Sequence, residues 1–385
     1  MRETSVAPAY SAATVECGWS VGGARFTARI RTITVSVLVP CAGHLTIGRF
    51  MTNVPLRGGD ADSAVTTNTI RKLLSLVFRY RRIESDADSC ARRPCAGCYE
   101  VHWERTRDFL AREEPVHFIL PAFPAKSNNP RKVIGALPDL GERIAIEFLQ
   151  SFCEQVSHIY PPGARITICS DGHVFSDVLG IPDEDVTRYR DELARIIRAT
   201  GGGSIALYSL DDAFGREPGP SSFDAMRERL VSRHATPIEE LRRQVRADLA
   251  ARSMFNGMHR FMVEDQTPLH PGLSRTKLRA SCKDLAYVMI QRSRAWGDLV
   301  GELFPGSLRL SIHPQRSHAE KIGFHLIRTR DSWLTPWHGV VVDDGTSLTL
   351  VKRSQAEAMN ASLIRRNGRP SHYVHPDIPT EEIAS

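Results

Sequence analysis

The chain has 385 residues, 42% of them hydrophobic and 24% charged, which is ordinary for a globular protein with one large domain or two smaller ones. Its net charge of +6 comes from scattered arginines, which fits an anionic small molecule at least as well as nucleic acid. No segment approaches the roughly 18 apolar residues of a transmembrane helix, and the N-terminus lacks the order of a signal peptide. The eight cysteines form no disulfide framework. We therefore expect a cytoplasmic protein that binds neither nucleic acid nor a membrane.

Residues 1–66 are poorly patterned, being rich in Ala, Thr, Val and Gly and lacking helical periodicity. We interpret them as an N-terminal extension of the main domain. Two interpretations of the segment before Met51 remain open. Met51 could be the natural start, with an extension or a wrongly assigned start before it. Alternatively, this segment could form an ordinary flexible tail with a hairpin.

From residue 67 the chain shows helical periodicity and then alternates between strands and helices. Short apolar runs typical of buried strands occur at Val116–Leu120, Arg165–Cys169 and Ser204–Tyr208. Helical patterns lie between them at Asp139–Ile159 and Asp183–Ala199. Strands separated by helices of this length indicate βαβ units and a parallel sheet.

The sequence after residue 221 is first helical and then returns to β. In a helical subregion at about 222–303, helices are expected at Phe223–Arg233, Pro237–Val263 and Arg275–Leu303. Strands are expected at Leu308–His313, Gly323–Arg328, Gly339–Asp343 and Ser347–Val351. Residues 367–385 are rich in proline and charge and are expected to form a flexible tail. The predicted fold is α/β over residues 67–366: a Rossmann-like, mostly parallel sheet with flanking helices, a helical insertion and a C-terminal β segment.

The loop that follows the strand Val116–Leu120 is the strongest site candidate. Its sequence from Leu120 to Glu142 is LPAFPAKSNNPRKVIGALPDLGE. Cations and polar donors that leave the carboxyl end of a strand are typical of anion sites in α/β proteins. The candidate ligands for a phosphate or carboxylate are Lys126, Ser127, Arg131 and Lys132, with Lys321 as a further cation.

Two further polar segments carry groups that could transfer protons. Asp171 and Asp177 follow the strand Arg165–Cys169, and the carboxyl ends of neighbouring parallel strands meet at one edge of the sheet. His313 ends a predicted strand, and His338 lies in a Pro/Gly turn beside a tryptophan. All four are candidate catalytic residues. The alternatives are a turn with a local Asx-type bond for the aspartates and hydrogen-bonded structural roles for the histidines.

Cys90, Cys95, Cys98 and His102 have ligand types and local spacing that could hold a structural zinc ion. The spacing is not that of a standard finger or ribbon, and buried free cysteines are the alternative. Gly201–Gly203 precedes a strand and is therefore a linker or helix stop, not a dinucleotide fingerprint. The sequence also lacks the P-loop, the G-x-S-x-G elbow and the H-E-x-x-H motif.

Three segments together resemble the pyoverdine/dityrosine biosynthesis family, whose best-known members are isocyanide (isonitrile) synthases. They are the loop of residues 120–142, the segment ICSDGHVFSDVLGIPDEDVTRYRDEL at 168–193, and LRLSIHPQ…EKIGFHL…WLTPWHGVVV at 308–342. The resemblance covers roughly residues 68–352. It leaves out the segment before Met51 and the tail.

The resemblance implies a reaction in secondary-metabolite biosynthesis without a redox cofactor. The α-amine of an aromatic amino acid such as tyrosine or tryptophan condenses with the C2 ketone of ribulose 5-phosphate. Loss of water and phosphate and cleavage of carbon–carbon bonds leave C2 as the isocyanide carbon. The downstream partner in this family is often an iron/2-oxoglutarate oxygenase. Two alternatives stay open: an enzyme of the dityrosine type that forms an N-formyl amino acid, and a non-catalytic sugar-phosphate or amino-acid binding protein.

Overall fold

The computed structural model describes the backbone of residues 12–21, 24–41, 44–51, 60–85, 87–215, 222–331 and 333–377. Side chains are described from residue 64 onward within these ranges, except at residue 222. The chain divides into two units, Met1–Val65 and Thr66–Ser385. In the first unit the backbone forms an antiparallel sheet in the order β1-β2-β3, made of β1 (Ala12–Val21), β2 (Ala24–Cys41) and β3 (His44–Met51).

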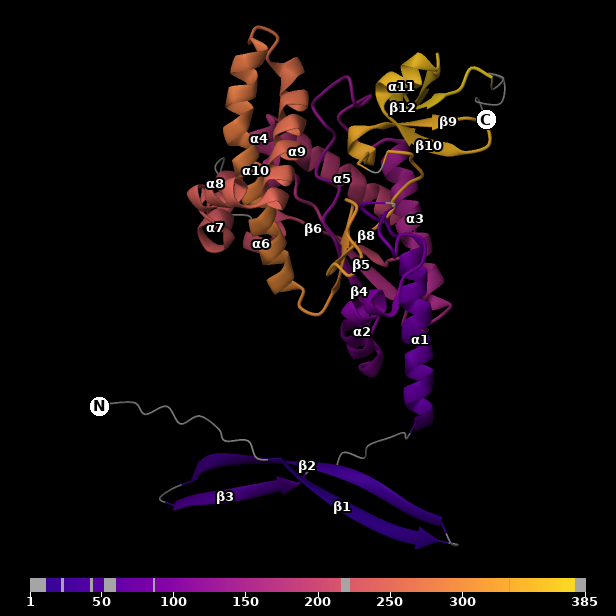
Figure 1. Cartoon of the computed structure of the whole chain (residues 1–385), viewed down its shortest axis with the longest axis vertical. Helices are drawn as coiled ribbons and strands as arrows, with labels where there is room; N and C mark the ends of the chain where they lie inside the picture. The colour runs from indigo at the N-terminus through magenta and orange to yellow at the C-terminus, as the bar shows by residue number, and fades with distance from the viewer. Residues whose placement is uncertain are drawn as a thin grey trace, which may run out of the picture. The chain divides into compact units, whose positions relative to one another are not determined.

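A five-stranded parallel sheet forms the centre of the second unit (Figure 1). Its strands are β4 (Val116–Leu120), β5 (Ala164–Cys169), β6 (Ile205–Tyr208), β7 (Leu308–Ser311) and β8 (Lys321–Gly323). The order β6-β5-β4-β7-β8 reverses between β4 and β7, because the chain adds β5 and β6 on one side and β7 and β8 on the other. The parallel sheet predicted from the sequence is confirmed.

Both faces of this sheet are covered, as expected for a parallel sheet with helical connections. Successive residues of β4 point to opposite faces: Phe118 and Leu120 belong to one core cluster and Ile119 to another. The first cluster contains apolar residues of α1 (Asp60–Arg79), α2 (Ala96–Ala111), α3 (Leu140–Ser157) and α5 (Asp183–Ala199). The second contains residues of α4 (Gly172–Leu179) and of the helical subregion.

The helical subregion consists of α6 (Leu210–Phe214), α7 (Ser222–His234), α8 (Ile238–Ala247), α9 (Leu249–Gln266), a 3-10 turn (Thr267–Leu269) and α10 (Arg275–Leu303). The prediction of a single helix over Pro237–Val263 is wrong in one respect: the helix is interrupted at Asp248, between α8 and α9. This residue has extended backbone angles, and its side chain accepts a hydrogen bond from the backbone of Ala251. Asp248 thus caps the start of α9.

The predicted strand Gly323–Arg328 is also displaced, since β8 ends at Gly323. The backbone beyond it bonds to the segment after α1, where Arg81 bridges Phe324. Gly323 makes this close approach possible, because a Cβ at this position would lie 2.3 Å from the carbonyl oxygen of Arg82.

A second sheet lies at the C-terminal end, with the order β10-β9-β12-β11. It consists of β9 (Val340–Asp343), β10 (Leu348–Val351), β11 (Ser362–Arg366) and β12 (Arg369–Val374), with α11 (Arg353–Ala358) between β10 and β11. The prediction of a flexible tail over residues 367–385 is therefore wrong for residues 369–374, which form a strand paired with β11. Asn367 and Gly368 both have positive φ and make the tight turn of a hairpin. Residues 378–385 lie outside the described residues.

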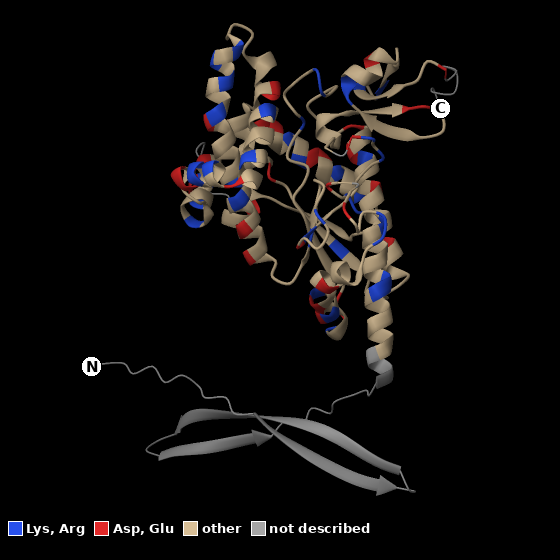
Figure 2. Cartoon of the chain, in the orientation of Figure 1, with Lys and Arg blue, Asp and Glu red and all other residues tan. Residues whose placement is uncertain are grey.

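Positively and negatively charged residues are interspersed along the helices of the second unit (Figure 2). This distribution agrees with the scattered arginines seen in the sequence. Among the residues that the structure describes, none of the helices combines the length and the apolar composition needed to cross a membrane.

Candidate active site

The carboxyl ends of β4 and β7 are neighbours where the strand order reverses, which is the position at which open α/β sheets bind ligands. Four segments meet near this point: residues 121–139 after β4, 170–172 after β5, 312–320 after β7, and 335–339. We call them the switch-point loops. The first and last are in direct contact, since the rings of Phe123 and Trp337 are 5.0 Å apart and the backbone N–H of Ser127 donates to the Trp337 carbonyl oxygen at 3.0 Å.

Asp171 lies between β5 and the first turn of α4. Burial raises the pKa of its carboxyl to about 7. Its buried Oδ1 has no hydrogen-bond partner among the residues that the structure describes. Gly172 lets this turn pack on the loop after β4, because a Cβ there would lie 2.0 Å from the carbonyl oxygen of Pro124. A carboxyl that titrates near neutral pH and has an unused oxygen is suited to proton transfer.

His338 is the last residue of a short 3-10 turn (Pro336–His338), and its ring has contacts on two sides. Its Nδ1 lies 3.1 Å from the hydroxyl of Thr335, and its ring packs edge-on against Phe261 of α9, with centroids 5.3 Å apart. Burial, together with the nearby cations of Lys132 and Lys126 and with His313, lowers the pKa of His338 to about 3. The imidazole is therefore neutral at pH 7.

His313 extends from the carboxyl end of β7 and is near enough to His338 to lower its pKa. Its ring is 5.4 Å from that of Trp333. The His313 side chain is exposed. Desolvation by the protein groups around the imidazole nevertheless lowers its pKa to about 4, and the positive charges of Arg82 and Lys321 act in the same direction. The structure thus brings together two of the predicted proton-transfer residues, both neutral near pH 7.

Lys132 is the predicted cation that lies beside this pair. Its ammonium contacts Asp265 Oδ1 at 2.6 Å and Glu264 Oε2 at 3.3 Å, and it lies 5.1 Å from the centroid of the Phe261 ring. Ser127 Oγ donates to the other oxygen of Asp265 at 3.3 Å. These contacts connect the loop after β4 to α9 and leave 14% of the Lys132 side chain exposed.

Lys126, by contrast, is closed off from any ligand. Its ammonium contacts Asp139 Oδ2 at 2.7 Å, Glu142 Oε2 at 2.8 Å and the Pro336 carbonyl oxygen at 3.0 Å. Its side chain is 1% exposed. Burial opposes the charge, but the two carboxylates outweigh it and raise the pKa of Lys126. Asp139 and Glu142 also form the capping box of α3, so this cation fixes the start of α3 against the loop that carries His338.

The remaining predicted site residues lie in different surroundings. Asp177, within α4, pairs with Arg292 of α10 at 2.5 Å and lies 3.8 Å from Arg227 of α7, so it joins helices on one face of the sheet. Arg131 is exposed in the loop after β4. Lys321 is exposed at the first residue of β8, close enough to His313 for its charge to help lower the pKa of that imidazole.

Sequence reasoning missed the contributions of α9 and of the segment after α1. Phe261 and Asp265 from α9 contact His338 and Lys132, and the buried Arg82 donates to the carbonyl oxygen of Ile312 at 2.7 Å. The available signal was the polar group Glu264–Gln266 directly after the apolar residues 261–263. Nothing in the sequence, however, indicates that α9 reaches the loop after β4.

The predicted metal ligands need one correction. Cys90, Cys95 and Cys98 do come together, but the fourth group is His318 from the β7–β8 connection, and all four ligand atoms lie within 4.8 Å of one another. His102 is not part of this group. It is buried and faces Phe78, with ring centroids 6.0 Å apart. His102 lies one helical turn after Cys98 on α2, on the face of the helix that is buried in the core.

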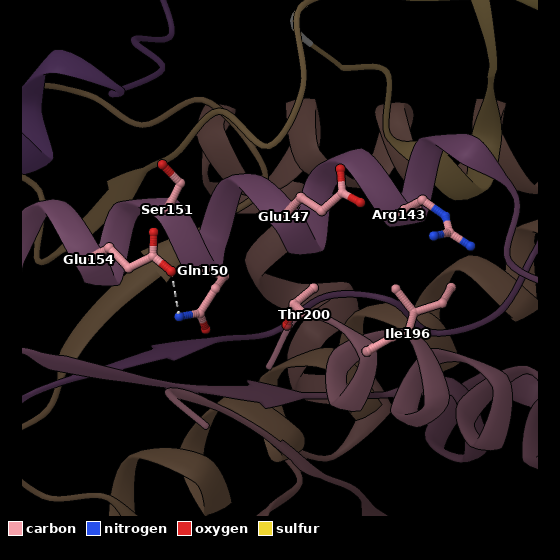
Figure 3. A pocket seen from close by; sticks show the side chains of 8 residues that line it. Arg143, Glu147, Gln150, Ser151, Glu154, Ile196 and Thr200 are labelled. Carbon is pink, nitrogen blue, oxygen red and sulfur yellow. Dashed lines mark hydrogen bonds between the residues drawn. The ribbon is translucent and has the colours of Figure 1, made fainter. Parts of the chain in front are cut away.

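A groove of about 220 Å³ lies between α3 and α5 (Figure 3). Its lining residues are Arg143, Glu147, Gln150, Ser151, Glu154, Ile196, Ala199 and Thr200. It contains none of the predicted site residues. Its two glutamates make it unfavourable for a phosphate, so we place the candidate site at the switch-point loops.

The family model described as pyoverdine/dityrosine biosynthesis protein matches residues 106–364. The L-tryptophan isonitrile synthase AmbI2 of Fischerella ambigua is 47% identical over 310 residues, which is 80% of this chain and 93% of that protein. An L-tyrosine isonitrile synthase of Pseudomonas aeruginosa is 38% identical over 320 residues, 82% of this chain and 96% of that protein. The chain therefore belongs to the pyoverdine/dityrosine biosynthesis family, and to the isonitrile synthases within it.

The fold agrees with this assignment. The crystal structure of the PvcA protein from Pseudomonas aeruginosa matches with a TM-score of 0.72 and 37% sequence identity, over 80% of this chain and 99% of that one. The resemblance inferred from the three sequence segments is confirmed.

Proposed function

We propose that this isonitrile synthase acts on the α-amine of an aromatic L-amino acid, tryptophan in the first place, with ribulose 5-phosphate as the carbon donor. The relative of 47% identity acts on L-tryptophan and the one of 38% identity on L-tyrosine, which orders the two candidates. The observation that carries the site proposal is that His338 and Lys132 both lie against the ring of Phe261 near the switch point of the sheet, with His313 close enough to His338 to affect its pKa.

The proposed chemistry needs proton transfer more than redox power. Condensation of an amine with the C2 ketone of ribulose 5-phosphate requires removal of protons from nitrogen and delivery of a proton to the departing oxygen. Two imidazoles that are neutral near pH 7 can accept protons, and Asp171 can donate or accept one, since its pKa is raised to about 7. Subsequent loss of phosphate and carbon–carbon cleavage would use the same groups.

The surroundings of the histidines suit the two substrates. Phe261 and Trp333, each in ring contact with one histidine, offer apolar surface for an aromatic side chain. Lys132 and the exposed Arg131 are the cations that we assign to the substrate phosphate or carboxylate. Lys126 has no free donor to offer and acts as a positioning residue. A cytoplasmic location and an iron/2-oxoglutarate oxygenase acting downstream remain part of the proposal.

The function is tested by incubating the purified full chain with ribulose 5-phosphate carrying ¹³C at C2 and with L-tryptophan, L-tyrosine or L-phenylalanine. We expect a labelled isonitrile, with the highest kcat/KM for L-tryptophan. Mass spectrometry under quick and mild conditions separates the isonitrile from its hydration product. A labelled formamide formed from the first time point would instead support the N-formyl branch, and no product with any substrate would support a binding protein.

The pH dependence of kcat/KM should show whether the carboxyl of Asp171 takes part in the reaction. If its carboxylate is a base, kcat/KM rises about tenfold per pH unit below about 7 and levels off above it, because the carboxyl must first lose its proton. Asp171→Asn should remove this limb and lower the plateau by about 10²–10⁴-fold. Asp177→Asn is the matched control and should keep the limb. An unchanged limb in Asp171→Asn would exclude Asp171 as the titrating group.

A further inference from the structure

Three cysteines and one histidine converge in a cluster that contains none of the candidate catalytic residues. Cys90 and Cys95 lie in the segment between α1 and α2, and Cys98 is in the first turn of α2. His318 comes from the β7–β8 connection, far from the cysteines in the sequence. Its Nε2 lies 3.0 Å from Cys95 Sγ and 3.9 Å from Cys90 Sγ, and the sulfur atoms of Cys95 and Cys98 are 4.0 Å apart.

These separations fit the geometry of one tetrahedral zinc ion. With Zn–S bonds of about 2.3 Å and Zn–N bonds of about 2.0 Å, tetrahedral ligand atoms lie roughly 3.5–3.8 Å apart. All four atoms lie within 4.8 Å of one another, so small side-chain rotations bring them to that spacing. Three thiolates and an imidazole form one of the usual donor sets of structural zinc, and soft thiolate ligands disfavour magnesium or calcium.

Hydrogen bonds of Asp88 hold the two backbone segments of the cluster in place. Asp88 accepts hydrogen bonds from the backbone of Cys90 at 2.9 Å and from the backbone and hydroxyl of Ser317 at 3.0 and 2.7 Å. One carboxylate thus ties together the two segments that carry the ligands. His318 itself has a φ of +64°, which a non-glycine residue rarely adopts.

We propose that Cys90, Cys95, Cys98 and His318 bind one Zn²⁺ in a closed structural site. Four protein ligands leave no open position for substrate or water, so the ion has no catalytic role. It fastens the segment before α2 to the β7–β8 connection, which also carries His313. The three cysteines precede residue 106, where the match to the family model begins.

The first test is the metal content of the wild-type full chain, expressed with zinc in the medium and measured by plasma mass spectrometry. We expect one zinc per chain. Cys95→Ser and His318→Ala change exposed residues and should each reduce zinc occupancy at least tenfold. His102→Gln is the matched control and should retain the ion. Substoichiometric zinc in the wild type, or loss of zinc in His102→Gln but not in His318→Ala, would overturn the site.

A second measurement does not depend on the folding of any variant. Removal of zinc from the wild-type chain by a chelator should lower Tm, and addition of Zn²⁺ should restore it. Replacement by Co²⁺ should give the intense visible bands of tetrahedral cobalt–thiolate coordination. A Cys95–Cys98 disulfide in the freshly purified protein, with no effect of the chelator on Tm, would show a redox pair instead. The readouts are independent of isonitrile formation, so this proposal and the proposed function can fail separately.

Discussion

Replacement of His338 by glutamine is expected to lower kcat by about 10²–10⁴-fold with little change in Tm. The side chain is a neutral imidazole beside Lys132, Phe261 and Thr335. In the proposed mechanism it accepts a proton from the reacting amine. Glutamine is of similar size and keeps a polar group near the Thr335 hydroxyl, but it cannot take up a proton. Steady-state rates with L-tryptophan and ribulose 5-phosphate, together with thermal unfolding, measure the two effects separately.

The matched control is His158→Gln, since His158 is exposed at the C-terminal end of α3 and belongs to none of the switch-point loops. It should keep wild-type kcat. His313→Gln should also lower kcat, and the double variant His313→Gln/His338→Gln should lose less than the product of the two single losses, as residues that serve one step are not additive. Wild-type kcat in His338→Gln would remove this residue from the proposed mechanism.

The sheet was predictable because its signals are local. Val116–Leu120 is a continuous apolar run with all five residues buried, and helical periodicity separates it from the next strand. The errors have physical causes of the same local kind. Asp248 interrupts a helical pattern through its capping side chain, and the Asn367–Gly368 pair makes a hairpin turn inside a segment that looked too polar to be ordered.

The candidate site was predictable only in its position along the chain. The rule that ligands bind at the carboxyl ends of parallel strands identified the loop after β4 and the turn at Asp171. It could not distinguish Lys126 from Lys132, because that difference depends on which carboxylates surround each ammonium. Asp265 faces Lys132 from α9, which is distant in the sequence, and His318 completes the cysteine cluster from an equally remote segment. Such pairings are set by tertiary packing.

Replacement of Lys126 by methionine is expected to lower the free energy of unfolding by about 3–5 kcal/mol, the usual cost of removing one partner from a buried ion pair. Methionine fills most of the volume but leaves the carboxylates of Asp139 and Glu142 without their cation in a site where the lysine side chain is only 1% exposed. Urea denaturation of the purified variant measures the loss. Arg131→Met, which removes an exposed cation from the same loop, should change stability by no more than about 0.5 kcal/mol.

The same variants decide between a structural and a ligand-binding role for Lys126. Adding Glu142→Gln to Lys126→Met should recover part of the lost stability, because it removes one of the two uncompensated charges. At a temperature where Lys126→Met is folded, its KM for ribulose 5-phosphate should stay within a few-fold of wild type, whereas Lys132→Met should raise that KM by tenfold or more. A Lys126→Met protein of wild-type stability with a large increase in this KM would instead make Lys126 the phosphate ligand. Its ammonium would then have to leave Asp139, Glu142 and the Pro336 carbonyl oxygen when substrate binds.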